Sequence, residues 1–84
     1  MVRVIVCGAY GRMGQEVIKA LSEQEDMMIA GAIDVRGIGE SISGITVRDN
    51  LEEVIKETEP SAIVDFTKRE AALEDIKTGV KNNV

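Results

Sequence analysis

An apolar strand that runs directly into regularly spaced glycines constrains this chain more than any other feature of its sequence. Residues 4–7 read Val-Ile-Val-Cys, glycines follow at positions 8, 11 and 14, and a helical pattern of apolar residues begins there. A run of β-branched residues without a polar face is typical of a central strand in a parallel sheet that is covered on both sides. The segment therefore predicts an α/β fold, and 84 residues limit the chain to one domain.

The three glycines have separate predicted roles. Gly8 ends the strand in a tight turn, Gly11 lets the backbone approach phosphate oxygens, and Gly14 lets the helix lie close to the sheet. The N–H groups and the dipole at the start of the helix favour an anion there.

The spacing G-x-x-G-x-x-G is one residue longer than the common dinucleotide fingerprint G-x-G-x-x-G, so its context carries the interpretation. Asp34 closes the next apolar run, at the point where a carboxylate accepts ribose hydroxyls. The alternative is that the glycines only permit close helix packing and that Asp34 closes a turn.

The rest of the sequence alternates strand and helix patterns. It predicts strands at 2–7, 28–33 and 61–66, helices at 11–22, from Asn50 to before Pro60 and from Thr67 to Gly79, a loop at 35–44 and a short extended piece at 45–47. This alternation implies a Rossmann-like, three-layer α/β fold, with a parallel sheet in the order two-one-three and helices on both faces. Three strands with two open edges are unusual, so we expect a truncated half of a longer protein.

Each predicted helix is expected to bury one face. The inner-face residues are Met13, Val17, Ala20 and Leu21 in the first helix, Leu51, Val54 and Ile55 in the second, and Leu73, Ile76 and Val80 in the third. Asn50 with Glu53, and Thr67 with Glu70, have the spacing of capping boxes at the start of the second and third helices.

Charge is distributed unevenly along the chain. The formal net charge of −5 argues against general binding to a nucleic-acid backbone, which needs a basic surface. Four of the ten cations follow the three predicted strands, at the edge where open α/β sheets bind ligands: Arg12, Arg36, Lys68 and Arg69. This placement favours a small anionic ligand, although charged loops without a ligand explain it equally well.

Rare residue types exclude several classes of site. The chain has no histidine, which excludes Ser-His triads and most zinc sites, and its acidic runs lack the glycine-bent loop of a hard-cation site. We therefore expect no metal and name no catalytic residue. A single cysteine, Cys7, excludes an internal disulfide and fits a reducing compartment. No apolar run has the length of a membrane span and no leader precedes the first strand, so we expect a cytoplasmic protein.

Three motifs together resemble the N-terminal domain of dihydrodipicolinate reductase. They are Gly-Ala-Tyr-Gly-Arg-Met-Gly at 8–14, Gly-Ala-Ile-Asp at 31–34 and Val-Asp-Phe-Thr at 64–67, and the resemblance covers essentially the whole chain. It implies that residues 1–84 are a single NAD(P)-binding domain of a homotetrameric oxidoreductase of lysine and diaminopimelate biosynthesis, which reduces a cyclic dicarboxylate imine with NADH or NADPH. The implied cofactor-binding residues are Gly8, Tyr10, Gly11, Arg12, Met13, Gly14, Asp34, Val35, Arg36, Phe66, Thr67 and Lys68.

The resemblance also implies what this chain lacks. Asp65, Phe66 and Thr67 would border the cofactor on its way to the nicotinamide. The family's Gly-Thr-Thr-Gly loop, His-His motif, catalytic lysine and substrate domain would all lie beyond Val84. We therefore expect the chain alone to bind dinucleotide weakly and not to catalyse reduction.

One departure from the family's pattern concerns the choice of cofactor. Where the family often has an arginine for the 2′-phosphate of NADP, this chain has Val35, and Arg36 follows one position later. Asp34 would repel a 2′-phosphate, and Arg36, Arg12 or Lys68 would offset that repulsion by turning toward it. The preference between NADH and NADPH is therefore open at this point.

Three other functions are also open. One is the cofactor domain of a homoserine or aspartate dehydrogenase, which the Arg-Met pair and Asp-Phe-Thr disfavour. Another is a non-catalytic nucleotide- or CoA-sensing module, against which Asp34 counts because a ribose-binding carboxylate suits a dinucleotide better than a 3′-phosphorylated CoA. The third is a half-Rossmann unit whose exposed strand edge pairs with a second copy.

Overall fold

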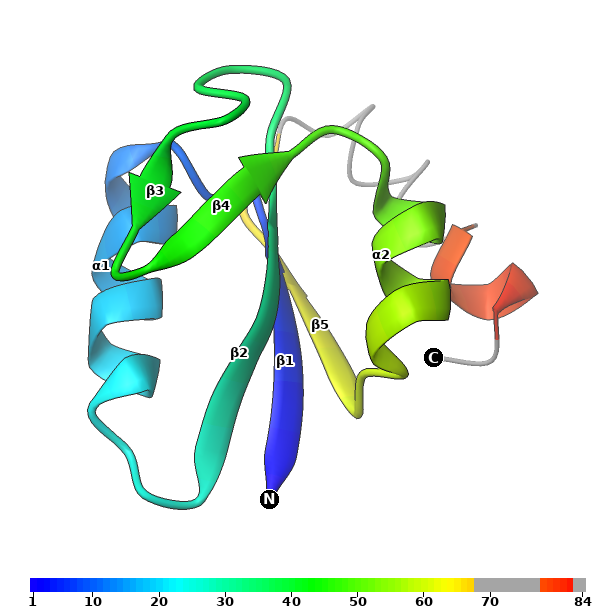
Figure 1. The fold of residues 1–84 in the computed structure, drawn as a ribbon, viewed down its shortest axis with the longest axis horizontal. Coiled ribbons are helices and arrows are strands. Elements are labelled where there is room, and N and C mark those ends of the chain that lie inside the picture. The colour runs from blue at the N-terminus through cyan, green and yellow to red at the C-terminus, as the bar shows by residue number, and fades with distance from the viewer. Residues whose placement is uncertain (68–77, 83–84) are drawn as a thin grey trace.

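The chain folds into a sheet with a helix on each face (Figure 1). The computed structural model describes residues 1–67 and 78–82. Its elements are β1 (Val2–Cys7), α1 (Arg12–Ser22), β2 (Met27–Ile33), β3 (Ser41–Ile42), β4 (Ile45–Arg48), α2 (Leu51–Thr58) and β5 (Ala62–Asp65), and residues 78–81 form a further helical turn. Neither α1 nor α2 is long and apolar enough to cross a membrane, and the same holds for the turn at 78–81.

The strand order is β3-β4-β2-β1-β5. β1 pairs in parallel with β2 and with β5, and β4 pairs in parallel with β2. The predicted order two-one-three is therefore confirmed for β2-β1-β5, but the prediction of only three strands is wrong. Ser43 and Gly44 both have positive φ (50° and 84°) and form a two-residue turn, which pairs Ile42 with Ile45 and adds the antiparallel β3–β4 hairpin.

Two apolar clusters lie on opposite faces of the sheet, because side chains alternate along β1. Val4 and Val6 pack in the cluster that contains Ile18 of α1, and Ile5 and Cys7 pack in the cluster that contains Val54 of α2. The predicted three layers, with helices on both faces, are confirmed. Burial on both sides also explains why β1 has no polar face.

The buried face of α1 differs from the predicted one. Gly14 and Ile18 are its buried residues, whereas Met13 is 56% exposed and Ala20 is also exposed. The prediction was wrong at these two positions because Gly14, whose place is fixed by close contact with the end of β1, sets the rotation of the helix. Met13 is then turned by about 100° from that face.

α2 begins and ends as the sequence predicts. The Asn50 side chain accepts a hydrogen bond from the Glu53 backbone N–H at 3.0 Å, and the helix ends at Thr58, where Glu59 has left-handed φ (48°) and Pro60 follows.

The helical turn at 78–81 corrects a second burial prediction. Val80 is 70% exposed and Gly79 is buried, so the predicted inner-face role of Val80 is wrong. Adjacent helical positions point about 100° apart, and Gly79 occupies the inner one. The predicted capping box at Thr67 and Glu70 and the inner positions Leu73 and Ile76 depend on residues outside the described ones.

An exposed ion pair between β4 and α2 makes stability depend on pH. Arg48 donates to Glu57 through both terminal nitrogens and also contacts Glu53 at 3.2 Å. The hydrogen bond from Arg48 holds the pKa of the Glu57 carboxyl below its usual range. The contribution of the pair is therefore complete above the ordinary carboxyl pKa and is lost as pH falls through the lowered value.

We expect Glu57→Gln to be less stable than the wild type near neutral pH, by an amount that shrinks on acidification. Urea unfolding of both proteins between about pH 7 and pH 3 measures this difference. A difference that stays constant or grows toward acid would contradict the assignment.

Candidate functional site

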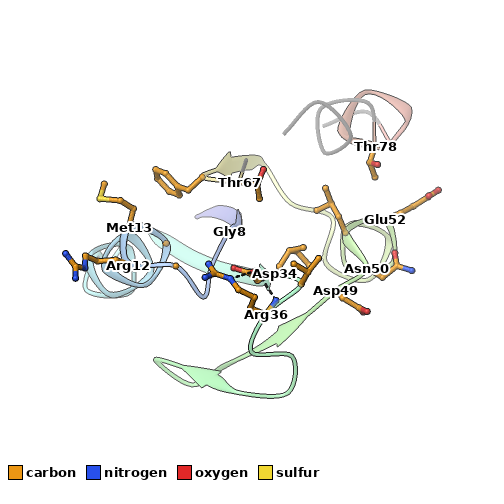
Figure 2. A pocket seen from close by; sticks show the side chains of 16 residues that line it. Gly8, Arg12, Met13, Asp34, Arg36, Asp49, Asn50, Glu52, Thr67 and Thr78 are labelled. Carbon is orange, nitrogen blue, oxygen red and sulfur yellow. Dashed lines mark hydrogen bonds and ion pairs between the residues drawn. The ribbon is translucent and has the colours of Figure 1, made fainter. Parts of the chain in front are cut away.

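A cleft of about 820 Å³ opens where the chain leaves the carboxyl ends of β1, β2 and β5. The chain runs from β1 to β2 on one side and has β5 on the other, so this is the topological switch point at which open α/β sheets bind ligands. Figure 2 shows Gly8 with Thr67 on one side and Asp34 on the other. The lining residues are Gly8, Gly11, Arg12, Met13, Gly14, Ile33, Asp34, Val35, Arg36, Asp49, Asn50, Leu51, Glu52, Phe66, Thr67 and Thr78.

The glycine-rich loop, residues 8–14, forms one side of the cleft. Gly8 has φ of +77°, and a Cβ there would lie 2.9 Å from the carbonyl carbon of Phe66. A Cβ on Gly14 would lie 2.2 Å from the Gly8 carbonyl oxygen, which no side chain tolerates. The fold itself therefore requires glycine at these two positions, for a tight turn at Gly8 and for a close helix contact at Gly14.

Gly11 differs from the other two glycines of this loop. A Cβ built on it would come no nearer than 3.4 Å to any atom beyond its chain neighbours, and its φ of −71° suits every residue. Gly11 is also the N-cap of α1 and offers no side-chain cap, so no capping side-chain oxygen accepts from the first N–H groups of the helix. The loop fits the phosphate-binding geometry, in which a group outside the protein takes up the space that a Cβ would fill.

Asp34 ties the glycine-rich loop to the loop that follows β2. It is 8% exposed, its Oδ2 accepts from the Tyr10 backbone N–H and its Oδ1 accepts from the Arg36 backbone N–H, both at 3.0 Å. The Arg36 Nε lies 3.7 Å from Oδ1. Asp34 therefore does close a turn, as the alternative interpretation held. A carboxylate oxygen has two acceptor positions, so Oδ2 keeps one for a further donor.

The predicted cations are placed differently from one another. Arg36 turns back over the glycine-rich loop, where its Nη2 would lie 3.4 Å from a Cβ on Gly11. In Figure 2 the Arg12 side chain extends away from Asp34. Lys68 and Arg69 lie outside the described residues. Of the two predicted cations that the structure describes, Arg36 is therefore the one whose side chain lies over the glycine-rich loop.

The structure gathers most of the predicted site residues at the cleft. Ten of the twelve line it: Gly8, Gly11, Arg12, Met13, Gly14, Asp34, Val35, Arg36, Phe66 and Thr67. Tyr10 does not line it and instead lies against Gly37, where a Cβ would meet the ring at 2.2 Å. The remaining one, Lys68, falls among the undescribed residues.

Sequence reasoning missed the wall of the cleft that the start of α2 provides. Its residues are Asp49, Asn50, Leu51 and Glu52, and Ile33 and Thr78 also line the cleft. Recognition of residues 45–48 as a strand parallel to β2 would have placed residue 49 onward at the same edge of the sheet.

Two lysines lower the pKa of the Glu52 carboxyl in this wall below its usual range. The larger effect is the hydrogen bond from Lys81, at 3.2 Å, and the smaller is the hydrogen bond from Lys56. Within the described part of the chain, no three acidic or cysteine side chains gather as a metal would require.

Relatives of known identity match the whole chain. Residues 2–84 match the family described as "Dihydrodipicolinate reductase, N-terminus". The chain is 38% identical to the 4-hydroxy-tetrahydrodipicolinate reductase of Methanocaldococcus jannaschii and 42% identical to that of Methanococcus aeolicus, with all of this chain covered in both. It spans about a third of the length of these curated relatives, 35% and 36%.

Solved structures show the same fold. A dipicolinate-bound dihydrodipicolinate reductase from Paenisporosarcina sp. TG-14 matches all of this chain with a TM-score of 0.83 at 29% identity, over 35% of its own length. RSP, a Rex-family repressor, matches with a TM-score of 0.90 at 20% identity, over 42% of its length, and shows the fold alone. The family match over 83 of the 84 residues decides the assignment: this chain belongs to the dihydrodipicolinate reductase family and corresponds to the N-terminal domain of its members.

Proposed function

We propose that residues 1–84 form the dinucleotide-binding domain of an NADH- or NADPH-dependent dihydrodipicolinate reductase, and that this chain alone binds the cofactor without catalysing reduction. The observation that supports this most directly is the position above Gly11, at the uncapped start of α1, where a Cβ would fit without a clash and would touch only the Arg36 side chain and the Gly8 carbonyl oxygen, both at 3.4 Å. Asp34 follows the end of the neighbouring strand β2 and lies twenty positions after Gly14 in the sequence, which is the spacing expected of a ribose-binding carboxylate.

The cleft residues divide between the parts of the cofactor. The N–H groups at the start of α1 would hold the pyrophosphate, with Arg36 above Gly11 to balance its charge. Asp34 Oδ2 would accept from an adenosine ribose hydroxyl, while Phe66 and Thr67 would border the nicotinamide half. The nicotinamide supplies hydride when bound, and the residues described here orient it and supply no proton.

The substrate, the partner and the compartment follow from the family as further parts of this proposal. The remaining two thirds of the relatives' length would provide the substrate domain and the proton donor for reduction of a cyclic dicarboxylate imine in lysine and diaminopimelate biosynthesis. The parent would be a cytosolic homotetramer, and the chain's net charge of −5 gives no support to a nucleic-acid partner.

Parallel titration with NADH and NADPH by calorimetry tests this function. We expect saturable binding at millimolar ligand. Asp34→Ala should weaken the binding of NADH more than that of NADPH. Both cofactors lose the carboxylate that accepts from the ribose, but NADPH also loses the repulsion between this carboxylate and its 2′-phosphate. The NADPH-to-NADH affinity ratio should rise about tenfold.

The ratio is the informative quantity in this experiment, because Asp34 also holds two loops together and its loss weakens the fold for both ligands equally. Thermal unfolding of the variant measures that shared loss. Failure of the wild type to bind either cofactor would refute the proposed function, and an unchanged ratio would remove Asp34 from the ribose site.

A further inference from the structure

Thr67 lies where β5 meets the cleft, beside the glycine-rich loop. It follows β5 by two residues and lines the cleft. Its backbone nitrogen would lie 3.1 Å from a Cβ on Gly8, so the missing side chain of Gly8 is what lets Thr67 approach the loop. A ligand held at the start of α1 that extends past Gly8 toward β5 meets Thr67 next.

Asp65 holds both hydrogen-bond donors of Thr67. The Thr67 backbone N–H donates to Asp65 Oδ1 at 2.8 Å, and the Thr67 hydroxyl lies 2.5 Å from the same oxygen. The hydroxyl is the donor in this bond, so its hydrogen points at Asp65 Oδ1. The hydroxyl oxygen of this cleft-lining residue therefore keeps lone pairs as acceptors and has no proton left to donate.

The two sides of Gly8 consequently have opposite hydrogen-bonding character. The start of α1 presents N–H donors, which suit phosphate oxygens. The β5 side presents an acceptor next to Asp65, whose Oδ2 is buried and has no partner among the described residues. This negative surrounding disfavours a phosphate at Thr67 and favours a group that carries O–H or N–H.

We propose that Thr67, oriented by Asp65, accepts a hydrogen bond from a donor on the nicotinamide riboside half of the cofactor. The inference rests on the proposed function, which places the pyrophosphate at α1 and the adenosine toward β2, so the riboside half lies toward β5. Two donors belong to that half, the ribose hydroxyls and the carboxamide NH₂, and both match an acceptor-only oxygen. Asp65 is a positioning residue, since it acts through Thr67.

Titrations of the ¹⁵N-labelled chain followed by NMR can test this inference even when binding is weak. Three ligands are compared: NADH, ADP-ribose, which keeps the second ribose but has no carboxamide, and ADP, which has neither. We expect Thr67→Val to weaken NADH about threefold to tenfold and to leave ADP unchanged. Thr67→Ser keeps the hydroxyl and should restore the NADH affinity.

The ADP-ribose arm separates the two donors. A loss shared by NADH and ADP-ribose assigns the ribose hydroxyl, and a loss confined to NADH assigns the carboxamide; either supports the inference. A double-mutant cycle tests Asp65: in an Asp65→Ala background, Thr67→Val should lose most of its effect on NADH, because the hydroxyl is no longer oriented.

Three results would overturn the inference. The first is an unchanged NADH affinity in Thr67→Val, even if the variant loses thermal stability. Equal weakening of ADP and NADH would show a general effect on the fold. A wild-type chain that NADH does not shift at all would refute the proposed function itself, and the inference with it.

Discussion

Replacing Gly14 with alanine is expected to lower the unfolding midpoint by about 12–24 °C, because it costs about 3 kcal/mol in a domain of this size. The added Cβ would lie 2.2 Å from the Gly8 carbonyl oxygen and 2.8 Å from the Ala9 Cα. Both are backbone atoms at the end of the central strand, so relief requires α1 to move away from the sheet. Thermal unfolding followed by circular dichroism measures the loss.

Gly11→Ala is the matched control for this prediction, since it adds the same methyl group three residues earlier. Its Cβ would be no nearer than 3.4 Å to any atom beyond its chain neighbours. Alanine is a poorer N-cap than glycine but lowers the entropy of the unfolded chain, and these opposed effects are each about 0.5–1 kcal/mol. Its midpoint should stay within a few degrees of the wild type. Equal losses for the two variants would mean that the Gly8–Gly14 contact is not what requires glycine.

The second large effect concerns binding rather than stability. We expect Gly11→Ala to weaken NADH and NADPH at least about tenfold, because the methyl group takes the space over the start of α1 that a phosphate oxygen would use. Calorimetric titration of the folded variant measures this. The expected result is therefore a variant with a normal unfolding midpoint and lost affinity.

Val35→Ala provides a comparison at the same cleft. Val35 lines the cleft but is 84% exposed, so its truncation should change neither the fold nor phosphate binding to a similar extent. Undiminished NADH affinity in Gly11→Ala would contradict the assignment of this loop to the pyrophosphate.

The central part of the fold could be predicted because its signals are local and agree with one another. The apolar run of β1 has no polar face, the glycines follow at once, and Asn50 and Pro60 mark the ends of α2. The parallel order then follows from the handedness of the crossovers. Nearly all of the predicted cleft residues come from these segments, which explains why they gather at one sheet edge.

The β3–β4 hairpin could not be read in the same way. β3 has two residues, too few to show any periodicity, and glycines surround it. The usable indication was the Ser43-Gly44 pair between two isoleucines, a two-residue turn that requires positive φ. Without that turn, the sequence predicts only a short extended piece where β4 lies, and the prediction of the site omits the wall of the cleft that begins at Asp49.

The misplaced helix residues have a different cause, since spacing alone does not fix the rotation of a helix. In α1 the rotation is set by a residue without a side chain, Gly14, which hydrophobic patterns do not count. In the turn at 78–81, too, the buried position is a glycine, Gly79, while Val80 is exposed. Apolar patterns indicate that a helix has an inner face, but in α1 the close contact of Gly14 decides which face it is.

The contact between Tyr10 and Gly37 gives this molecule a built-in optical reporter. Tyr10 is the single tyrosine and the chain has no tryptophan, so ultraviolet-excited protein fluorescence comes almost entirely from one ring. That ring packs where the glycine-rich loop meets the loop after β2, and the Tyr10 backbone N–H donates to Asp34. Its emission therefore reports the separation of these two loops, without a label and without any change to the sequence.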